Sequence, residues 1–314
     1  MRQVAKAIEM AKEEIFITDW WFDPEVELTR DQSERKKLKD LLIKKVDEGM
    51  KVFILVYGNV ESVLPLGNYA NIKLLKNNVT DSHNENIGMY TMYHPDFRAG
   101  AEDGVQQVQW AHHEKLVVID QSTAFVGGID LCIGRYEIHG KYPLFDNEKP
   151  YVFHGQDFFN HYEAMDWKVP ASRENKWRGP WHDIACQVFG DVARDVSRHF
   201  IERWNHCKRQ IKKHKTERDL PLIMPKSITS SDLDYRFNID DSHPAQGSIV
   251  ECDSIQVLRS VSSWSAGINN KEKSIYNAYR DLITSAERFL YIENQFFVSS
   301  AIDDERNDLN IYKY

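Results

Sequence analysis

Apolar residues occur along this chain in two alternating patterns. Val4, Ala7, Ile8 and Ala11 lie three or four positions apart, which predicts one face of an amphipathic helix. Short uninterrupted apolar runs rich in Val and Ile predict buried strands. The first third of the chain gives these elements in order: helix 4–11, strand 15–17, helix 38–48, strand 52–57 and a weaker strand 72–74. This alternation predicts an α/β domain with helices on both faces of a mixed sheet.

The pattern changes after residue 76. Residues 77–104 are rich in Asn, Asp and Gly, which predicts a long loop. Three more strands are predicted at 116–119, 123–126 and 184–189. Residues 138–180 show little periodicity and are expected to form a loop over a cleft. Residues 192–207 predict a helix with one apolar face, formed by Val192, Val196, Phe200, Ile201 and Trp204.

Candidate chemistry lies just before the strand at 116–119. His113 and Lys115 are two positions apart, so an extended backbone directs both side chains to the same face. Together they suit attack on a phosphate ester, because an imidazole can act as nucleophile or proton shuttle and an ammonium can hold anionic oxygens. Asp120 ends the strand, where its carboxylate can fix neighbouring groups. The alternative is a strand that begins with a solvated polar cluster.

The residues that follow extend this pattern into a recognisable motif. The spacing His113-x-Lys115-x4-Asp120-x6-Gly-Gly-x-Asp130 resembles the first active-site motif of the phospholipase D superfamily. The commoner ending is Gly-Ser-x-Asn, and the variant in this chain resembles that of the eukaryotic phosphatidylcholine-hydrolysing enzymes. Six further segments extend the likeness: 18–21, 131–136, 180–183, 198–205, 256–260 and 292–297.

The resemblance implies a layered α-β-α sandwich and hydrolysis of phosphatidylcholine to phosphatidic acid and choline through a phospho-histidine, without metal or cofactor. The predicted catalytic residues are His113 as nucleophile, Lys115 as oxyanion holder and Asp120 as a structural acid of the motif. The residues predicted to bind or orient substrate are Gly127, Gly128, Asp130, Asp146, Glu293 and Asn294. The glycine pair is interpreted as letting the backbone approach a ligand closely. Asp146 lies in a segment that resembles one supplying an acidic partner to a catalytic histidine, and the alternative is a surface Asp in a turn.

An internal repeat suggests two lobes. A helix followed by residues 13–19 resembles a helix followed by residues 287–293, and both strands would end in an acid. The expected division is a first lobe at 1–226, a linker at 227–248 and an incomplete second lobe at 249–314. His113 lies 94 residues after Asp19 (113 − 19), but only 21 residues follow Glu293 (314 − 293). We expect no second His-x-Lys-x4-Asp spacing among the other histidines, and hence a fragment that is inactive alone.

Charge and composition limit the partners. A net charge of −8 and a pI near 5.9 argue against a general nucleic-acid binder. With no long apolar run, no signal peptide and four scattered cysteines, we expect a cytoplasmic protein peripheral on the cytosolic face of membranes. The one dense basic cluster contains Lys208, Arg209, Lys212, Lys213 and Lys215. It could offset a helix dipole, or it could contact anionic lipid head groups, and the resemblance implies a response to phosphoinositides.

Three functions therefore remain open. The chain could be a phospholipase D that a missing C-terminal lobe completes. It could be a catalytically inactive module that binds lipid or a partner. It could also form a homodimer in which two copies of His113 build one site, as nucleophile and acid.

Overall fold

The computed structural model describes residues 1–31, 34–61, 65–80, 88–94, 111–138, 142–146, 149, 151–154, 157–158, 177–210, 220–227, 252 and 254–297. The chain divides into two compact units. The first unit contains Met1–Val257 and Val261–Lys271, and the second contains Leu258–Ser260 and Glu272–Tyr314. Most of the predicted linker at 227–248 lies outside the described residues.

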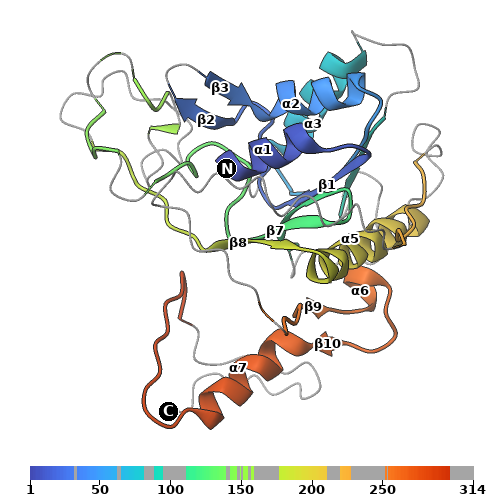
Figure 1. Cartoon of the computed structure of the whole chain (residues 1–314), viewed down its shortest axis with the longest axis vertical. Helices are drawn as coiled ribbons and strands as arrows, with labels where there is room; N and C mark the ends of the chain where they lie inside the picture. Colours follow the sequence, from blue (N-terminus) through green and yellow to red (C-terminus); the bar gives the residue numbers. More distant parts are fainter. Residues whose placement is uncertain are drawn as a thin grey trace. The chain divides into compact units, whose positions relative to one another are not determined.

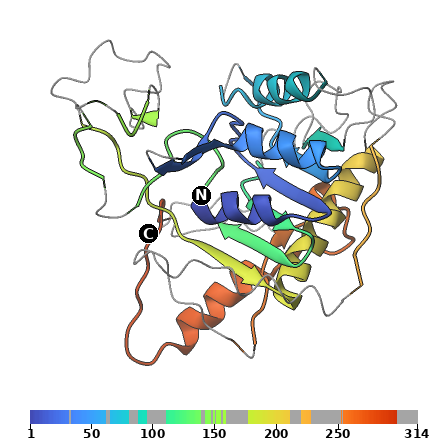
Figure 2. The same cartoon turned by 45° about the horizontal axis from the view of Figure 1, so that its top comes forward.

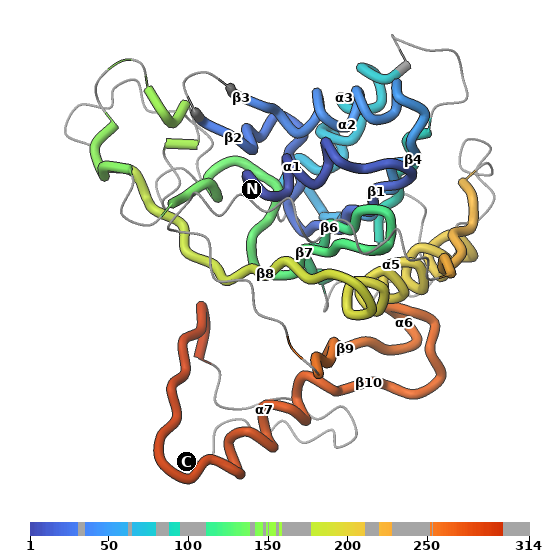
Figure 3. The backbone as a smooth tube through the Cα atoms, in the orientation of Figure 1, coloured from blue at the N-terminus to red at the C-terminus, as the bar shows by residue number. Residues whose placement is uncertain are grey.

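A six-stranded mixed sheet forms the centre of the first unit (Figure 1). Its order is β5 (Met89–Tyr93), β4 (Lys51–Val56), β1 (Glu14–Asp19), β6 (Lys115–Ile119), β7 (Thr123–Gly127) and β8 (Ala185–Phe189). β1 runs parallel to β4 and antiparallel to β6, so the order combines both kinds of pairing. Figure 3 follows the backbone and shows β1 and β6, far apart in sequence, side by side. The α/β fold with a mixed sheet is confirmed.

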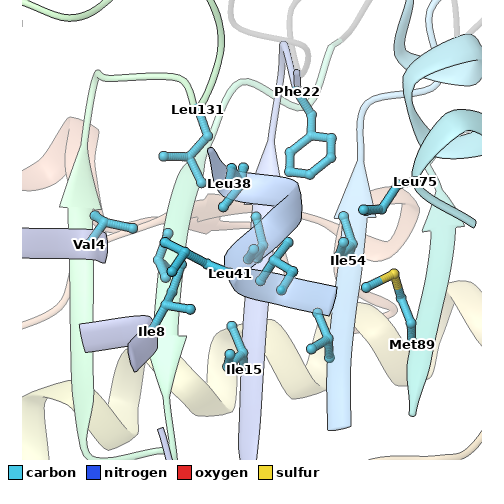
Figure 4. Packing of buried hydrophobic residues seen from close by; sticks show 14 of the residues in the cluster. Val4, Ile8, Ile15, Phe22, Leu38, Leu41, Ile54, Leu75, Met89 and Leu131 are labelled. Atoms are coloured by element: carbon cyan, nitrogen blue, oxygen red, sulfur yellow. The ribbon is translucent and has the colours of Figure 1, made fainter. Parts of the chain in front are cut away.

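Helices cover both faces of this sheet (Figure 2). One face packs against α1 (Arg2–Met10), α2 (Leu38–Asp47) and α3 (Asn68–Thr80) in a core that includes Ile8, Ile15 and Ile54. Figure 4 shows the packing of this core in close-up. The other face packs against α5 (Asp191–Gln210). The predicted layered sandwich is therefore present in the first unit.

Three local predictions for the first unit are wrong. Residues 72–74 belong to helix α3 and not to a strand, because Ile72 and Leu75 lie on one helical face that is buried in the core. β5 lies inside the predicted loop 77–104, where it pairs with β4. The hairpin of β2 (Glu27–Asp31) and β3 (Glu34–Lys37) is also missed, because its residues are mostly charged.

The second unit confirms one half of the expected repeat. It contains helix α7 (Ser274–Ser285) and strand β10 (Glu272–Lys273); β9 (Ser260–Val261) and α6 (Ser263–Ala266) precede them in the chain. The strand expected at 287–293 is absent, since residues 286–297 form neither helix nor strand. Its large side chains are exposed, Phe289 by 83% and Tyr291 by 79%. A strand needs neighbouring strands to satisfy its backbone, and the described part of this unit offers none beside these residues.

Asp120 fastens two turns of the first unit together. Its carboxylate accepts hydrogen bonds from the amides of Lys12, Glu13 and Glu14, at 2.9, 2.8 and 2.9 Å. These amides lie where the chain passes from α1 into β1. Asp120 has a φ of 51°, in the left-handed region that Asp tolerates better than most residues. One side chain therefore holds the turn after β6 against the start of β1.

We predict that Asp120→Ala lowers the free energy of unfolding by about 3 kcal/mol, because three buried or part-buried amides lose a charged acceptor. Urea unfolding followed by circular dichroism measures this loss. Asp120→Asn is the matched control, since it keeps one acceptor oxygen and the tolerance for positive φ, and it should lose less. Equal stability of Asp120→Ala and the parent chain would contradict this role.

Candidate active site

The sheet brings two motifs that are distant in sequence together at one end of its central strands β1 and β6. Because β1 and β6 are antiparallel, Thr18 near the end of β1 lies opposite Leu116 near the start of β6. Asp19 and Trp20 therefore meet His113 and Lys115. The segment after β7 adds Asp130, and the segment before β8 adds Asp183. The site thus combines residues from four segments of the first unit that are far apart in sequence.

His113 is held against an aromatic ring. Its imidazole lies 5.0 Å from the ring of Trp20, centroid to centroid, in an edge-on arrangement. Burial lowers the pKa of His113 below its usual 6.5, and the charge of Lys115 lowers it further, while Asp130 and Asp183 oppose these effects. A lowered pKa keeps the imidazole neutral near pH 7. A neutral imidazole has the lone pair that a nucleophile or general base requires.

Lys115 lies beside His113 as a buried ammonium. Its Nζ is 3.0 Å from Asp130 Oδ1 and donates to the carbonyl oxygen of His113 at 3.2 Å. It also lies 5.5 Å from the centroid of the Trp20 ring. An ammonium has three donors, and these two polar contacts use two of them. The geometry thus fixes a positive charge next to the neutral imidazole.

Asp19 and Asp130 form a carboxyl pair beneath Lys115. Burial raises the pKa of Asp19 well above its usual range, and the neighbouring charge of Asp130 raises it further. Burial by itself would also raise the pKa of Asp130, but the hydrogen bond with Asp19 and the charge of Lys115 together lower it. Asp19 therefore holds the proton and Asp130 carries the negative charge. The amides of Leu131 and Trp21 bind this pair, at 2.7 Å to Asp19 Oδ2 and 3.2 Å to Asp130 Oδ1.

Arginine and tryptophan side chains line one side of the site. The guanidinium carbon of Arg135 lies 3.6 Å from the centroid of the Trp181 ring and 5.2 Å from that of Trp21. Its Nε is 3.8 Å from Asp130 Oδ2. The indole of Trp181 donates a hydrogen bond to Asp183. Six residues of this site were not predicted as site residues from the sequence: Asp19, Trp20, Trp21, Arg135, Trp181 and Asp183. All six lie in the segments at 18–21, 131–136 and 180–183 that carry the resemblance.

The structure explains why positions 127 and 128 are glycines, and the reason differs from the expected close approach to a ligand. A Cβ on Gly127 would lie 2.5 Å from the Cα of Ala185, in the neighbouring strand β8. A Cβ on Gly128 would lie 2.2 Å from Asp183 Oδ1. The backbone therefore approaches β8 and the Asp183 carboxylate, and these contacts exclude any side chain. The lack of a side chain at Gly128 leaves the space that the Asp183 carboxylate occupies.

The structure does not bring Asp120 or Asp146 to His113. Asp120 lies at the opposite end of β6, where it binds the amides of residues 12–14. Asp146 is buried, so it is not a surface residue, and its carboxylate accepts hydrogen bonds from the amides of Val152 and Phe153. Both contacts are structural.

The expectation of a single His-x-Lys-x4-Asp spacing is wrong. His139-Gly140-Lys141-Tyr142-Pro143-Leu144-Phe145-Asp146 also has it. His139 and Lys141 lie outside the described residues, and residues 142–146 form no strand. The first copy differs because its Lys115 begins a buried strand. The spacing alone therefore does not make a second motif.

The remaining predicted residues belong to other elements of the chain. Glu293 and Asn294 belong to the second unit and are exposed, and Glu293 accepts a hydrogen bond from the hydroxyl of Tyr291 at 2.6 Å. Lys208 and Arg209 occupy the last turn of α5, where they complement the helix dipole. Lys212, Lys213 and Lys215 lie outside the described residues.

Two features are absent from the described residues. No helix among them is long and apolar enough to cross a bilayer. Within the same ranges, no group of three or more His, Cys, Asp or Glu side chains has an arrangement that could hold a metal ion.

Comparisons with known proteins agree with the motif. A family model described as "Phospholipase D" matches residues 7–310. "Phospholipase D2" of Bos taurus is 38% identical over 98% of this chain and 33% of its own length. "Phospholipase D1" of Schizosaccharomyces pombe is 35% identical over 96% of this chain and 21% of its own length. The chain thus spans about a third or less of these two relatives.

Among solved structures, the chain is similar to a phospholipase D family member, Nuc from Salmonella typhimurium. That match has 13% identity and a TM-score of 0.30, and it covers 65% of this chain and 85% of Nuc.

The protonation of the carboxyl pair gives a test. Asp130→Asn leaves the buried Lys115 without its counter-charge, and we predict a loss of about 3–5 kcal/mol in the free energy of unfolding. Asp19→Asn replaces a group that is already neutral and disturbs only its hydrogen bonds, so it should lose about 1 kcal/mol. Urea unfolding of both variants measures the difference. An Asp19→Asn loss equal to or larger than that of Asp130→Asn would show that the proton is on Asp130 instead.

Proposed function

Because this chain belongs to the phospholipase D family of phosphodiester hydrolases, we propose that it carries one half of an active site that hydrolyses phosphatidylcholine to phosphatidic acid and choline. The observation that carries this proposal is the neutral, half-buried imidazole of His113 beside the ammonium of Lys115. Phosphatidylcholine as the substrate follows from the likeness of the motif to the eukaryotic enzymes.

The first step is attack by a ring nitrogen of His113 on phosphorus. A phosphorus–nitrogen bond forms, and the bond from phosphorus to the choline oxygen breaks. Lys115 stabilises the negative charge on the non-bridging oxygens, since its ammonium is fixed beside the imidazole by Asp130. Water then attacks the phospho-histidine and gives a proton to the group that protonated the choline oxygen, the phosphorus–nitrogen bond breaks, and phosphatidic acid is released with His113 regenerated.

The departing choline oxygen needs a proton. We place this general acid on a second His-x-Lys-x4-Asp motif, carried either by a further lobe or, as a less favoured alternative, by a second copy of this chain. The greater length of the relatives supports the further lobe, because this chain spans 33% of the Bos taurus protein. On this proposal the isolated chain is a fragment of a two-lobed enzyme with little activity.

An alternative function is a catalytically inactive module that binds lipid or a partner protein. The basic residues Lys208, Arg209, Lys212, Lys213 and Lys215 favour a membrane surface with anionic head groups, such as phosphoinositides, because the rest of the chain is acidic. Each basic residue near such a surface contributes about 1 kcal/mol.

The test is release of choline and phosphatidic acid from phosphatidylcholine vesicles. We predict that His113→Ala abolishes turnover by any form of the protein that contains the acid-bearing half. His154→Ala is the matched control, because His154 is an exposed histidine of the same unit, and it should retain turnover.

Turnover that survives His113→Ala would contradict the proposal. A dimer in solution whose activity depends on His113 would favour the second copy as the source of the acid. No turnover in any form, with vesicle binding weakened by neutralising Lys212, Lys213 and Lys215, would favour the lipid-binding module instead.

The lowered pKa of His113 predicts the pH at which kcat/KM falls on the acid side of the pH profile, called the acid limb below. The imidazole is inactive when protonated, so kcat/KM should fall only as the pH drops through a value below the usual 6.5. Asp183→Asn removes a carboxylate that raises this pKa and should move the limb to still lower pH. A limb at or above pH 6.5, or a shift of the opposite sign in Asp183→Asn, would contradict the assignment.

A further inference from the structure

The two residues on either side of His113 point away from the site. Side chains alternate along an extended chain, so His113 and Lys115 share one face while His112 and Glu114 share the other. His113 and Lys115 contact Trp20 and Asp130. Glu114 contacts α5, and His112 contacts Trp264. None of the steps proposed above uses Glu114.

Glu114 is bound by two residues of one helix. His199 Nε2 lies 2.6 Å from Glu114 Oε2, and Arg203 Nη1 forms an ion pair with Glu114 Oε1. His199 and Arg203 are one turn apart on α5. That helix is fixed in the core, since the neighbouring side chains of Phe200 and Trp204 are fully buried. Glu114 thus connects the start of β6 to a rigid element on the other face of the sheet.

Arg203 extends the connection to the segment that follows β5. Its side chain is 2% exposed, and burial lowers the pKa of its guanidinium to about 10. Its Nη2 lies 3.4 Å from Nδ1 of His94, which follows β5. A buried ion pair is seldom more stabilising than apolar residues of the same volume, because both charges lose their hydration. The ion pair of Glu114 and Arg203 therefore contributes a fixed geometry and not stability.

His112 is held on the same face. Its ring stacks on Trp264 at 4.8 Å with an interplanar angle of 7°, and it lies 4.5 Å from the ring of His94. Burial lowers the pKa of His112 well below its usual value, so the ring stays neutral. Both neighbours of His113 in the sequence are therefore anchored behind the sheet. The backbone at His113 has little room to turn.

We propose that Glu114, through its bonds to His199 and Arg203, is a positioning residue that holds His113 and Lys115 in the orientation required for attack on phosphorus. Glu114 itself touches neither substrate nor reacting atoms and acts through the backbone of β6. The inference rests on the proposed catalytic role of His113. A displacement of about 1 Å at a reacting group can cost about 100-fold in rate.

The variant that tests this is Glu114→Gln, which keeps the size of the side chain and removes its charge. The first readout is the titration of His113 followed by NMR with ¹⁵N-labelled histidine, which needs no turnover. We expect the pKa of His113 to rise toward 6.5, because a loosened imidazole becomes more solvated. The second readout is steady-state kinetics in the active form, where kcat should fall about 10- to 100-fold and KM should stay within about twofold.

Asp195→Asn is the matched control, since it removes a carboxylate from an exposed pair on the same helix, 3.1 Å from Arg198. It should change neither readout. If Glu114→Gln does not fold, His199→Ala removes only one of the two bonds and should shift the titration less in the same direction. His199→Gln restores an N–H donor and should reverse that shift.

A folded Glu114→Gln variant, or a folded His199→Ala variant, with an unchanged His113 titration would overturn the proposal. The titration also separates it from the proposed function. If activity survives His113→Ala, the catalytic role of His113 fails, and the NMR shift still reports whether Glu114 holds the imidazole in place.

Discussion

The alternation of side chains along β6 is the constraint on which the rest of the site depends. The strand is buried on both faces, so each residue has a partner dictated by its parity. Val117 and Ile119 pack into the core beneath α1 and α2, while Leu116 and Val118 pack against α5. The same parity directs Lys115 toward Asp130 and Glu114 toward Arg203. A slip of one residue would exchange the two sets and bury the wrong charges.

Burial sets the protonation states of the site in opposite directions. It removes the proton from a base and keeps it on an acid, because the charged form loses its hydration in both cases. His113 is thereby neutral, and Asp19 is a neutral acid. Lys115 and Asp130 form an ion pair at 3.0 Å, in which each charge compensates the other. The outcome is a neutral imidazole next to the ion pair of Lys115 and Asp130, an arrangement that suits an anionic phosphodiester.

The described part of the second unit contains the helix of the repeat without its strand. Its helix α7 forms, since a helix satisfies its own backbone hydrogen bonds. The following residues repeat the pattern that forms β1 in the first unit, and they remain without strand structure. In the first unit, β4 and β6 pair with the backbone of β1 on both sides. The contrast identifies pairing, and not local propensity, as the cause of strand formation here.

The sequence by itself determined the α/β class, the strands β1, β4, β6, β7 and β8, the helix α5, and the pairing of His113 with Lys115 on one face. Each of these follows from local periodicity and alternation. Only the tertiary structure decided the roles of residues that act on distant partners. Asp120 binds amides more than a hundred positions away, Gly128 is a glycine because Asp183 occupies its side-chain space, and Glu114 reaches α5. Such contacts depend on how the sheet folds the chain back on itself, and no local pattern records them.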